Sequence, residues 1–230
     1  NVSQNNRELN SKNKKLLGGI LLYLKKEVDT ILKKFQKNEI NENNIKEIIH
    51  FIETKMSIPL PQEFKMFQFD YQKEYLIKIL NRPIRICGMV KNEGEPGGGP
   101  FWVQDEKGRP SLQIVELSQI DLNNENQLAI FKNSTHFNPV DIVCSVKDFE
   151  GNKFDLNQFM DPKTAFITEK TKNKKKIKAF ELPGLWNGAM ADWSTIFVEV
   201  PIETFNPVKK VTDLLKPAHQ PNNLDINSGL

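Results

Sequence analysis

The sequence predicts an α/β protein in which helices come first and a mixed sheet follows. Up to about residue 80, apolar residues recur at three- and four-residue steps, the period of helices that bury one face. From Ile84 onward, short β-branched runs are typical of strands. The third observation is composition. With 38% hydrophobic and 27% charged residues, the 230-residue chain suits a soluble globular protein with one good core or two small ones.

Three helices are expected before the sheet. The first covers residues 14–35, with apolar side chains on one face and many lysines on the other. The second covers residues 41–55 and begins at an asparagine cap, either Asn41 or Asn43. The third covers residues 71–80 and ends before a proline, because the residue that precedes proline avoids helical backbone.

The remaining elements are strands, turns and two short helices. Strands are predicted at residues 84–90, 101–103, 111–117, 140–146, 164–168 and 195–200. Gly151 marks a turn between two of them. Small residues after Pro183 predict a short helix at 183–193. A final helix is predicted at 208–215, before a polar tail.

Composition and charge exclude several classes of function. The net charge of +3 is too small to indicate nucleic acid as the main partner. The longest apolar run, residues 16–24, is about half the length of a membrane span. Cys87 and Cys144 lie in apolar runs without zinc-site spacing, so we expect buried free thiols in a reducing cytoplasm. We therefore expect a cytoplasmic protein that binds neither membrane nor nucleic acid.

A lysine-rich run covers residues 170–178, between two predicted strands. One interpretation is a solvated hairpin loop, and the other is a docking patch for an anionic ligand. Aromatic residues do not alternate with these lysines, so stacking on single-stranded nucleic acid is not supported.

The segment 87–101 is the most informative part of the chain. Four of the twelve glycines, Gly94, Gly97, Gly98 and Gly99, lie within six of its positions, between two predicted strands. Consecutive glycines lose much conformational entropy on folding. They are expected where the backbone comes very close to a phosphate, a sugar ring or another backbone segment. A mobile surface loop is the alternative.

Other candidate functional residues lie where predicted strands end. Glu116 follows a strand, and His136 and Asn138 lie in a turn crowded with polar groups. Either His136 binds a ligand or it stabilises its own turn. Glu93 and Glu95 have the chemistry of an acid–base pair or of ordinary solvated carboxylates. The serines and cysteines show no pattern of an activated nucleophile.

Four segments, in order, resemble the sugar-binding half of the UDP-sugar pyrophosphorylases. The glycine loop leads to L-Q-I-V-E-L-S-Q-I at 112–120, where that family has L-Q-L-L-E-I-A-Q-V. A polar turn at 133–138 follows, and then E-L-P-G-L-W-N-G-A-M at 181–190 in place of a small-residue helix. Residues 200–215 read V-P-I-E-T-F-N-P-V-K-K-V-T-D-L-L, similar to the family's V-P-R-x-R-F-L-P-V-K-x-x-S-D-L-L.

A closer resemblance is to the domain-of-unknown-function 4301 family, an uncharacterised bacterial group, from about residue 84 to residue 219. Its members resemble nucleotidyltransferases of the nucleotide-diphospho-sugar fold, with a Rossmann-like mixed sheet. They are longer than this chain and carry an N-terminal nucleotide loop that is not found here. The resemblance thus implies a fragment with a helical lead-in or linker at 1–82, the C-terminal, sugar-binding half at 83–220 and a polar tail at 221–230.

The resemblance implies a reaction of a sugar 1-phosphate with a nucleoside triphosphate to give a nucleotide sugar and pyrophosphate. Magnesium (Mg) is expected to bridge phosphates, although no ligands for it are visible in this chain. The alternative is a non-catalytic module that kept the fold and binds a nucleotide sugar or another carbohydrate.

The resemblance also assigns roles to individual residues. Lys209 is expected to be catalytic and to meet the sugar-linked phosphate, a task that suits a flexible ammonium group. Glu116 is expected to accept hydrogen bonds from sugar hydroxyls. The remaining substrate-binding residues are expected to be Gly97, Gly98, Gly99, His136 and Asn138.

Overall fold

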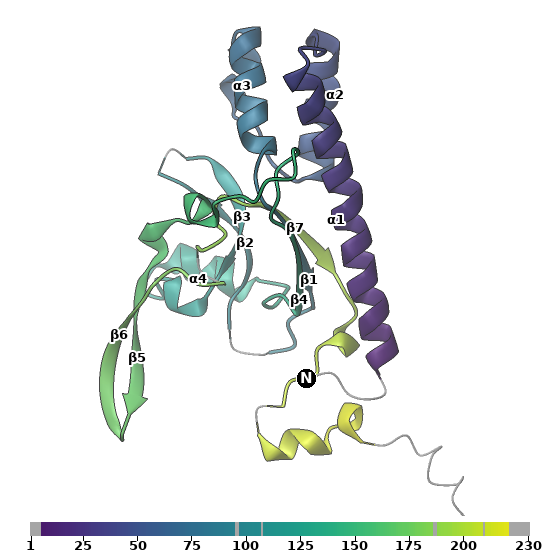
Figure 1. Cartoon of the computed structure of the whole chain (residues 1–230). Coiled ribbons are helices and arrows are strands. Elements are labelled where there is room, and N and C mark those ends of the chain that lie inside the picture. Colours follow the sequence, from purple (N-terminus) through teal and green to yellow (C-terminus); the bar gives the residue numbers. More distant parts are fainter. Residues whose placement is uncertain (1–5, 95–96, 107, 186–187, 209, 221–230) are drawn as a thin grey trace, which may run out of the picture.

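A computed structural model of the chain describes residues 6–94, 97–106, 108–185, 188–208 and 210–220. The long helix α1 (Arg7–Gln36) runs along one side of the molecule (Figure 1). Helices α2 (Glu42–Lys55) and α3 (Phe69–Leu80) stand beside its second half. The three predicted helices are confirmed, and α1 extends seven residues further toward the N-terminus than its apolar pattern, because polar residues also form helix well.

The cap of α2 shows why this helix begins where it does. The Asn41 side-chain oxygen accepts hydrogen bonds from the backbone N–H groups of Asn43 and Asn44, at 3.0 and 3.1 Å. The Asn44 side chain accepts one in return from the Asn41 N–H, at 3.0 Å. This reciprocal capping box satisfies N–H groups that have no partner within the helix. Of the two predicted caps, Asn41 is therefore the correct one.

A three-stranded mixed sheet forms the centre of the molecule. Strand β1 (Ile84–Met89) lies between β4 (Asp141–Ser145), which is antiparallel to it, and β7 (Ser194–Glu199), which is parallel. All six residues of β1 are buried, as expected for a central strand covered on both faces. The predicted combination of a helical N-terminal region and a mixed sheet is confirmed.

The other strands pair as two separate hairpins and do not join this sheet. Strands β2 (Gly99–Gln104) and β3 (Pro110–Val115) form one antiparallel hairpin, and β5 (Phe166–Lys172) and β6 (Lys175–Glu181) form the other. Ile114 of β3 packs on Cys87 and Met89 of β1. Since side chains alternate along a strand, these residues lie on the sheet face opposite to Ile84 and Ile86.

Helix α1 covers the sheet face that carries Ile84 and Ile86, and the helix and the sheet share one core. Leu17, Leu21 and Leu24 of α1 belong to the same buried cluster as Ile84 and Ile86 of β1. Each such side chain contributes about 1.5–3 kcal/mol when it is buried. The lead-in and the sheet are therefore stabilised by the same buried contacts, and the boundary predicted at residue 82 stays a prediction.

Gly88 lets α1 lie close to the sheet. A Cβ at this position would be 3.0 Å from Leu17 Cδ1 and 3.3 Å from a Val200 methyl group, tighter than almost all contacts of real Cβ atoms. Position 88 therefore has room only for glycine, because the helix, β1 and the residue after β7 meet there.

Two of the predicted short helices need correction. The described residues between 183 and 193 form turns and no helix. Gly188 has φ +85° and lies against Thr164, and the Gly188 carbonyl accepts the Asp161 N–H at 3.0 Å, so tertiary contacts determine this backbone. The predicted helix at 208–215 is a short 3₁₀ turn, Val211–Leu215. The turn at Gly151 is confirmed, with φ +93°.

Helix α4 (Glu125–Lys132) was not predicted, because its apolar residues show no clear helical period. Its cap is Asn124, whose side chain accepts the N–H groups of Asn126 and Gln127. The other short helical turns are η2 (Gln62–Met66), η3 (Leu117–Gln119), η4 (Leu156–Phe159), η5 (Pro162–Thr164), η6 (Ile202–Thr204), η7 (Val211–Leu215) and η8 (Pro217–His219). Within the described ranges, no helix has both the length and the apolar character that crossing a membrane requires.

Candidate functional site

The polar turn, residues 133–138, is fixed to the carboxyl end of β1. The Asn92 N–H donates to the Thr135 carbonyl and the Phe137 N–H to the Val90 carbonyl, both at 3.0 Å. Strands β1 and β7 are parallel, so their carboxyl ends meet at the same edge of the sheet. Ligands of open α/β sheets bind outside this edge. The polar turn predicted from the sequence therefore lies at the edge where sheets of this kind commonly bind ligands.

His136 lies in a hydrogen-bonded cluster at this edge. Its Nε2 is 3.0 Å from Glu199 Oε2, and its Nδ1 is 2.8 Å from Thr135 Oγ1. The Lys91 ammonium is 3.8 Å from the other Glu199 oxygen. The hydrogen bond from His136, followed by the charge of Lys91, lowers the pKa of Glu199. Both ring nitrogens are engaged, so the imidazole is held in one orientation.

The glycine loop approaches other backbone segments very closely. A Cβ on Gly98 would be 2.0 Å from the Val115 carbonyl oxygen, and one on Gly99 would be 2.7 Å from the His136 carbonyl oxygen. A Cβ on Gly97 would be 2.6 Å from the Phe137 ring. Of the three reasons considered for these glycines, close contact with another backbone segment is present. Contact of the same loop with a sugar stays a prediction.

These contacts bring Glu116 beside the polar turn. Glu116 follows β3, and the Asn138 side-chain N–H donates to its Oε1 at 3.3 Å. Among the described residues, Asn138 Oδ1 is buried without a hydrogen-bond partner. The structure thus brings together six of the predicted site residues, in two groups that the glycines join: Gly97, Gly98, Gly99, Glu116, His136 and Asn138.

Glu116 also lines a pocket of ≈ 410 Å³, called here the Glu116 pocket. This volume is within the range of about 300–1,000 Å³ that is usual for small-molecule sites. Burial raises the pKa of Glu116, the hydrogen bond from Asn138 opposes this, and the nearby Glu181 charge adds to the rise. The pocket residues are Glu116, Ser118, Phe166, Thr168, Glu181, Gly184 and Leu185.

Four polar pocket groups can exchange hydrogen bonds with a polyhydroxylated ligand. Glu116 and Glu181 supply carboxylates, and Ser118 and Thr168 supply hydroxyl groups. Sequence reasoning missed Ser118, Thr168 and Glu181 as site residues. Glu181 begins the segment at 181–190 that resembles the pyrophosphorylases, and this was the one signal that pointed to it.

Lys209, the predicted catalytic residue, lies outside the described residues. The segment that leads to it is described as far as Val208. Phe205 packs against Phe137 of the polar turn, with ring centroids 5.3 Å apart. The position of Phe205 brings this part of the motif at 200–215 to the polar turn, and the role of Lys209 stays a prediction.

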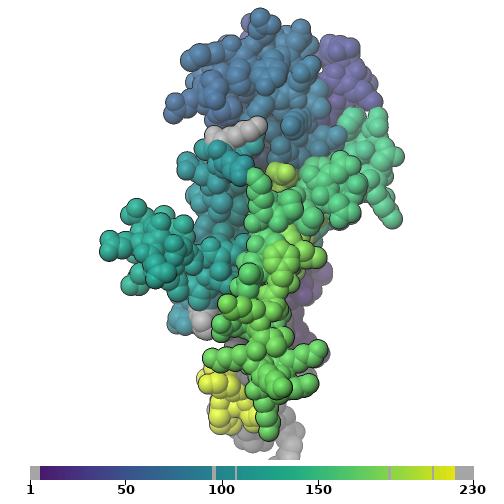
Figure 2. Space-filling view, turned by 90° about the vertical axis from the view of Figure 1, so that its left-hand side faces the viewer, coloured from purple at the N-terminus to yellow at the C-terminus, as the bar shows by residue number. Residues whose placement is uncertain are grey.

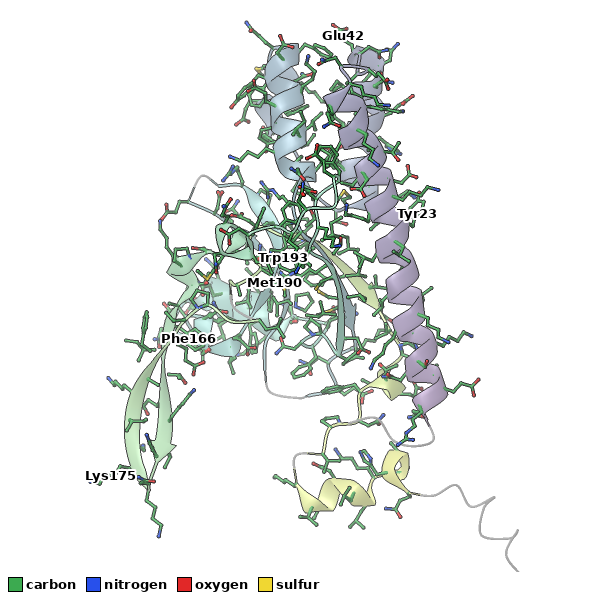
Figure 3. All side chains as sticks on the ribbon, viewed as in Figure 1. Tyr23, Glu42, Phe166, Lys175, Met190 and Trp193 are labelled. Carbon is green, nitrogen blue, oxygen red and sulfur yellow. The ribbon has the colours of Figure 1, made fainter. Side chains whose placement is uncertain are left out.

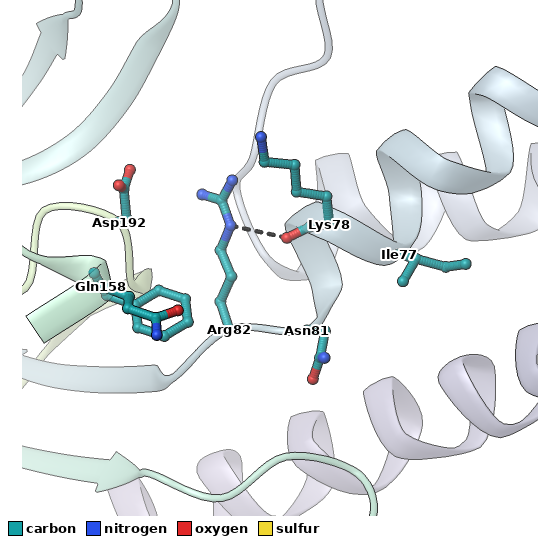
Figure 4. Close-up of a pocket in the computed structure, with 7 residues that line it drawn as sticks. Ile77, Lys78, Asn81, Arg82, Gln158 and Asp192 are labelled. Carbon is teal, nitrogen blue, oxygen red and sulfur yellow. Dashed lines mark hydrogen bonds between the residues drawn. The ribbon is translucent and has the colours of Figure 1, made fainter. Parts of the chain in front are cut away.

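A second pocket, of ≈ 280 Å³, lies between the end of α3 and the turns at 158–159 and 192 (Figure 4). The Arg82 Nε–H donates to the Lys78 carbonyl at 3.1 Å. Burial lowers the pKa of Arg82, and Asp192 opposes this shift. None of the predicted site residues lines this pocket, which lies where the helical region meets the rest of the molecule.

The described ranges contain no group of three or more His, Cys, Asp or Glu side chains placed to hold a metal ion. The Glu116 pocket has two carboxylates. In phosphoryl-transfer sites, Mg²⁺ is commonly held by one or two carboxylates together with substrate phosphates. The two side chains alone are therefore not a complete metal site, and magnesium stays an expectation of the resemblance.

The features so far define an α/β protein with a polar site at the carboxyl edge of a mixed sheet. The chain belongs to the family described as "Domain of unknown function (DUF4301)", which matches residues 1–220. The expected resemblance began at about residue 84, so the match extends it through the three helices. No curated protein matches the chain.

Similar solved structures include three mutants of UDP-glucose pyrophosphorylase from Leishmania major, each in complex with UDP-glucose. Two are 17% identical to this chain, with TM-scores of 0.36 and 0.37, and cover 70% of it and 34% of their own chains. The third is 15% identical, with a TM-score of 0.36, and the shares are 74% and 38%. The chain thus spans little more than a third of their length, and a likeness at this level assigns no substrate.

Proposed function

We propose that this chain forms the sugar-binding half of a nucleotidyltransferase that acts on a sugar 1-phosphate and a nucleoside triphosphate. One observation carries the proposal. Glu116, to which the motifs assign the sugar hydroxyls, is hydrogen-bonded to Asn138 and lines a pocket of ≈ 410 Å³ with other hydroxyl-binding groups. Two residues 22 positions apart, both assigned to one ligand by their motifs, are thus in contact.

In the proposed reaction, a phosphate oxygen of the sugar 1-phosphate attacks the α-phosphorus of the triphosphate. The bond from that phosphorus to the bridging oxygen breaks, and pyrophosphate leaves with the electron pair. Such a reaction needs little covalent work from the protein, which aligns the reactants and neutralises charge. Glu116 accepts hydrogen bonds from sugar hydroxyls, the Asn138 side-chain N–H holds the Glu116 carboxylate in place, and Lys209 neutralises the sugar-linked phosphate.

The test is thermal unfolding of the full-length gene product with sugar 1-phosphates and nucleotide sugars in the presence of magnesium. Ligand binding is measured as a rise in Tm. At a hundredfold excess over Kd, a ligand adds about 2.7 kcal/mol to the free energy of unfolding. For a chain of this size, that raises Tm by roughly 5–11 °C. A panel in which no sugar phosphate or nucleotide sugar raises Tm contradicts the proposal.

A matched pair of variants tests the site. Glu116→Gln removes one of the two pocket carboxylates, the one assigned to the sugar hydroxyls, and should abolish most of the rise in Tm. Glu169→Gln makes the same chemical change on β5, but Glu169 is exposed and is not a pocket residue, so its response should equal that of the wild type. A full response from Glu116→Gln shows that the pocket is not the site. Binding without release of pyrophosphate supports the non-catalytic module instead.

A further inference from the structure

The β5–β6 hairpin has two faces with different surroundings. Residues directly opposite each other in an antiparallel pair point to the same face, and the faces alternate along the strand. One face carries the pairs Phe166–Glu181, Thr168–Ala179, Lys170–Ile177 and Lys172–Lys175. The other carries Ile167–Phe180, Glu169–Lys178 and Thr171–Lys176.

The first of these faces is continuous with the Glu116 pocket. Phe166, Thr168 and Glu181, all on this face, line the pocket. We call it the pocket face. Phe166 lies at the base of the hairpin and Lys175 at its tip, which extends away from the sheet (Figure 3). The hairpin also forms a surface ridge, green in the space-filling view (Figure 2).

Lysines follow the pocket along this face. The Lys170 ammonium is 2.8 Å from Glu181 Oε1, so it lies at the edge of the pocket. The next pair toward the tip is Lys172 opposite Lys175. A ligand whose polar body lies between Glu116 and Glu181 therefore has three ammonium groups beyond one end of it.

This arrangement is not what hairpin stability favours. Like charges directly opposite each other destabilise a strand pair, and Lys172 and Lys175 are such a pair. Residues 166–181 contain six lysines and two glutamates. Strand residues near the tip are exposed, so burial does not offset the repulsion there. A bound anion would relieve it.

We propose that the pocket face binds the phosphate groups of the ligand, with Lys170 as the first cation and Lys172 and Lys175 beyond it. The inference rests on the proposed function for the nature of the group in the pocket, and it adds a phosphate subsite formed by Lys170, Lys172 and Lys175. The Lys170–Glu181 ion pair is exposed on both sides, so its loss costs little. When phosphate replaces Glu181 as the partner of Lys170, the Glu181 carboxylate becomes available to sugar hydroxyls.

Two pairs of substitutions with equal charge distinguish the faces. Lys170→Gln with Lys172→Gln removes two cations from the pocket face. Lys176→Gln with Lys178→Gln removes two from the other face of the same strands and serves as the control. Each pair deletes one lysine that has a glutamate nearby, Glu181 or Glu169. Thermal unfolding of each variant, compared with the wild type, checks that the fold is retained.

The probe is inorganic pyrophosphate, measured by titration calorimetry with the full chain at low salt. We expect saturable binding by the wild type, at least tenfold weaker binding by the pocket-face pair and a change below twofold in the control pair. Equal weakening by both pairs indicates general charge attraction and overturns the inference, as does an absence of saturable binding by the wild type. Stronger binding of a single-stranded oligonucleotide, with equal losses from both faces, also overturns it.

Glu116→Gln separates this inference from the proposed function. It should retain pyrophosphate binding, because the lysines remain, while it loses the response to sugar phosphates. If pyrophosphate binding depends on the pocket face but no sugar ligand binds, the phosphate subsite stands and the proposed function fails. If sugar phosphates bind and both lysine pairs behave alike, the proposed function stands and the phosphate subsite fails.

Discussion

Substitution of Gly98 by alanine tests the close packing that positions Glu116. The added Cβ would lie 2.0 Å from the Val115 carbonyl oxygen and 2.8 Å from the Glu116 Cα. Both neighbours are backbone atoms, so no side-chain rotation relieves the clash. The start of β2 must move away from the end of β3, where Gly99 and Val115 are paired.

The expected size of the effect follows from overpacking. Forcing extra atoms into a closely packed site costs about 1–3 kcal/mol. For a chain of this size, Tm should therefore fall by roughly 2–12 °C. Because the displaced backbone includes Glu116, the same variant should also lose the rise in Tm produced by sugar ligands.

Gly19→Ala in α1 is the matched control. A Cβ on Gly19 would have no atom within 4 Å, and the residue lies inside a helix. Alanine is favoured over glycine there by about 0.5–1 kcal/mol, so Gly19→Ala should raise the free energy of unfolding. Urea unfolding followed by circular dichroism measures both variants. If Gly98→Ala is as stable as the wild type while Gly19→Ala behaves as expected, the reasoning about the glycine loop is refuted.

Three further predictions concern the core, the cysteines and the pH dependence. Leu17→Ala should lower the free energy of unfolding, measured in urea, by about 2–5 kcal/mol, since Leu17 is 0% exposed. Leu22 is 72% exposed, so Leu22→Ala should change it by less than about 0.5 kcal/mol. Similar losses in the two variants would contradict the packing of α1. At pH 8, iodoacetamide should modify the exposed Cys144 well before Cys87, because Cys87 is buried and burial raises its pKa to about 12; equal labelling by mass spectrometry would refute this. Burial raises the pKa of Glu116 above its ordinary value of 4.5, so the folded state holds this proton more tightly than the unfolded state. Stability relative to Glu116→Gln should therefore be lost as pH rises from below 4.5 through the folded pKa, and a difference in Tm that stays constant from pH 4 to 7 would contradict the burial of the carboxyl.

Elements fixed by local interactions could be predicted from the sequence. The Asn41 cap depends on residues three positions apart, and the buried run at 84–89 is apolar enough to specify a central strand. The helix predicted at 183–193 failed for the opposite reason. There, Gly188 takes a left-handed conformation against Thr164, a contact between segments distant in the sequence. Cys144 was expected to be buried and is exposed; it lies on β4, a strand at the edge of the three-stranded sheet.

The site could be predicted only in part, and the same distinction explains why. Glu116 and Asn138 were found because each lies within a motif, and their hydrogen bond agrees with a shared ligand. Thr168 and Glu181 come from the β5–β6 hairpin, which no local pattern directs toward Glu116. The lysine run at 170–178 was interpreted either as a solvated loop or as an anion patch, and both interpretations placed it in a loop. In the structure, five of its six lysines lie on paired strands, so strand alternation decides which of them face the pocket.

The contacts of the glycines determine which residues can be used to test ligand binding. Gly88 admits a leucine of α1 and Gly98 admits the Val115 carbonyl, so in both places the small residue allows two parts of the protein itself to meet. The glycine loop is then required to build the site whether or not it touches a ligand, and loss of binding in a glycine variant cannot assign contact with a sugar. Such contact has to be tested at side chains whose substitution leaves the glycine contacts in place. Glu116 lines the pocket and the lysines lie on the pocket face, and for this reason the decisive variants are placed there.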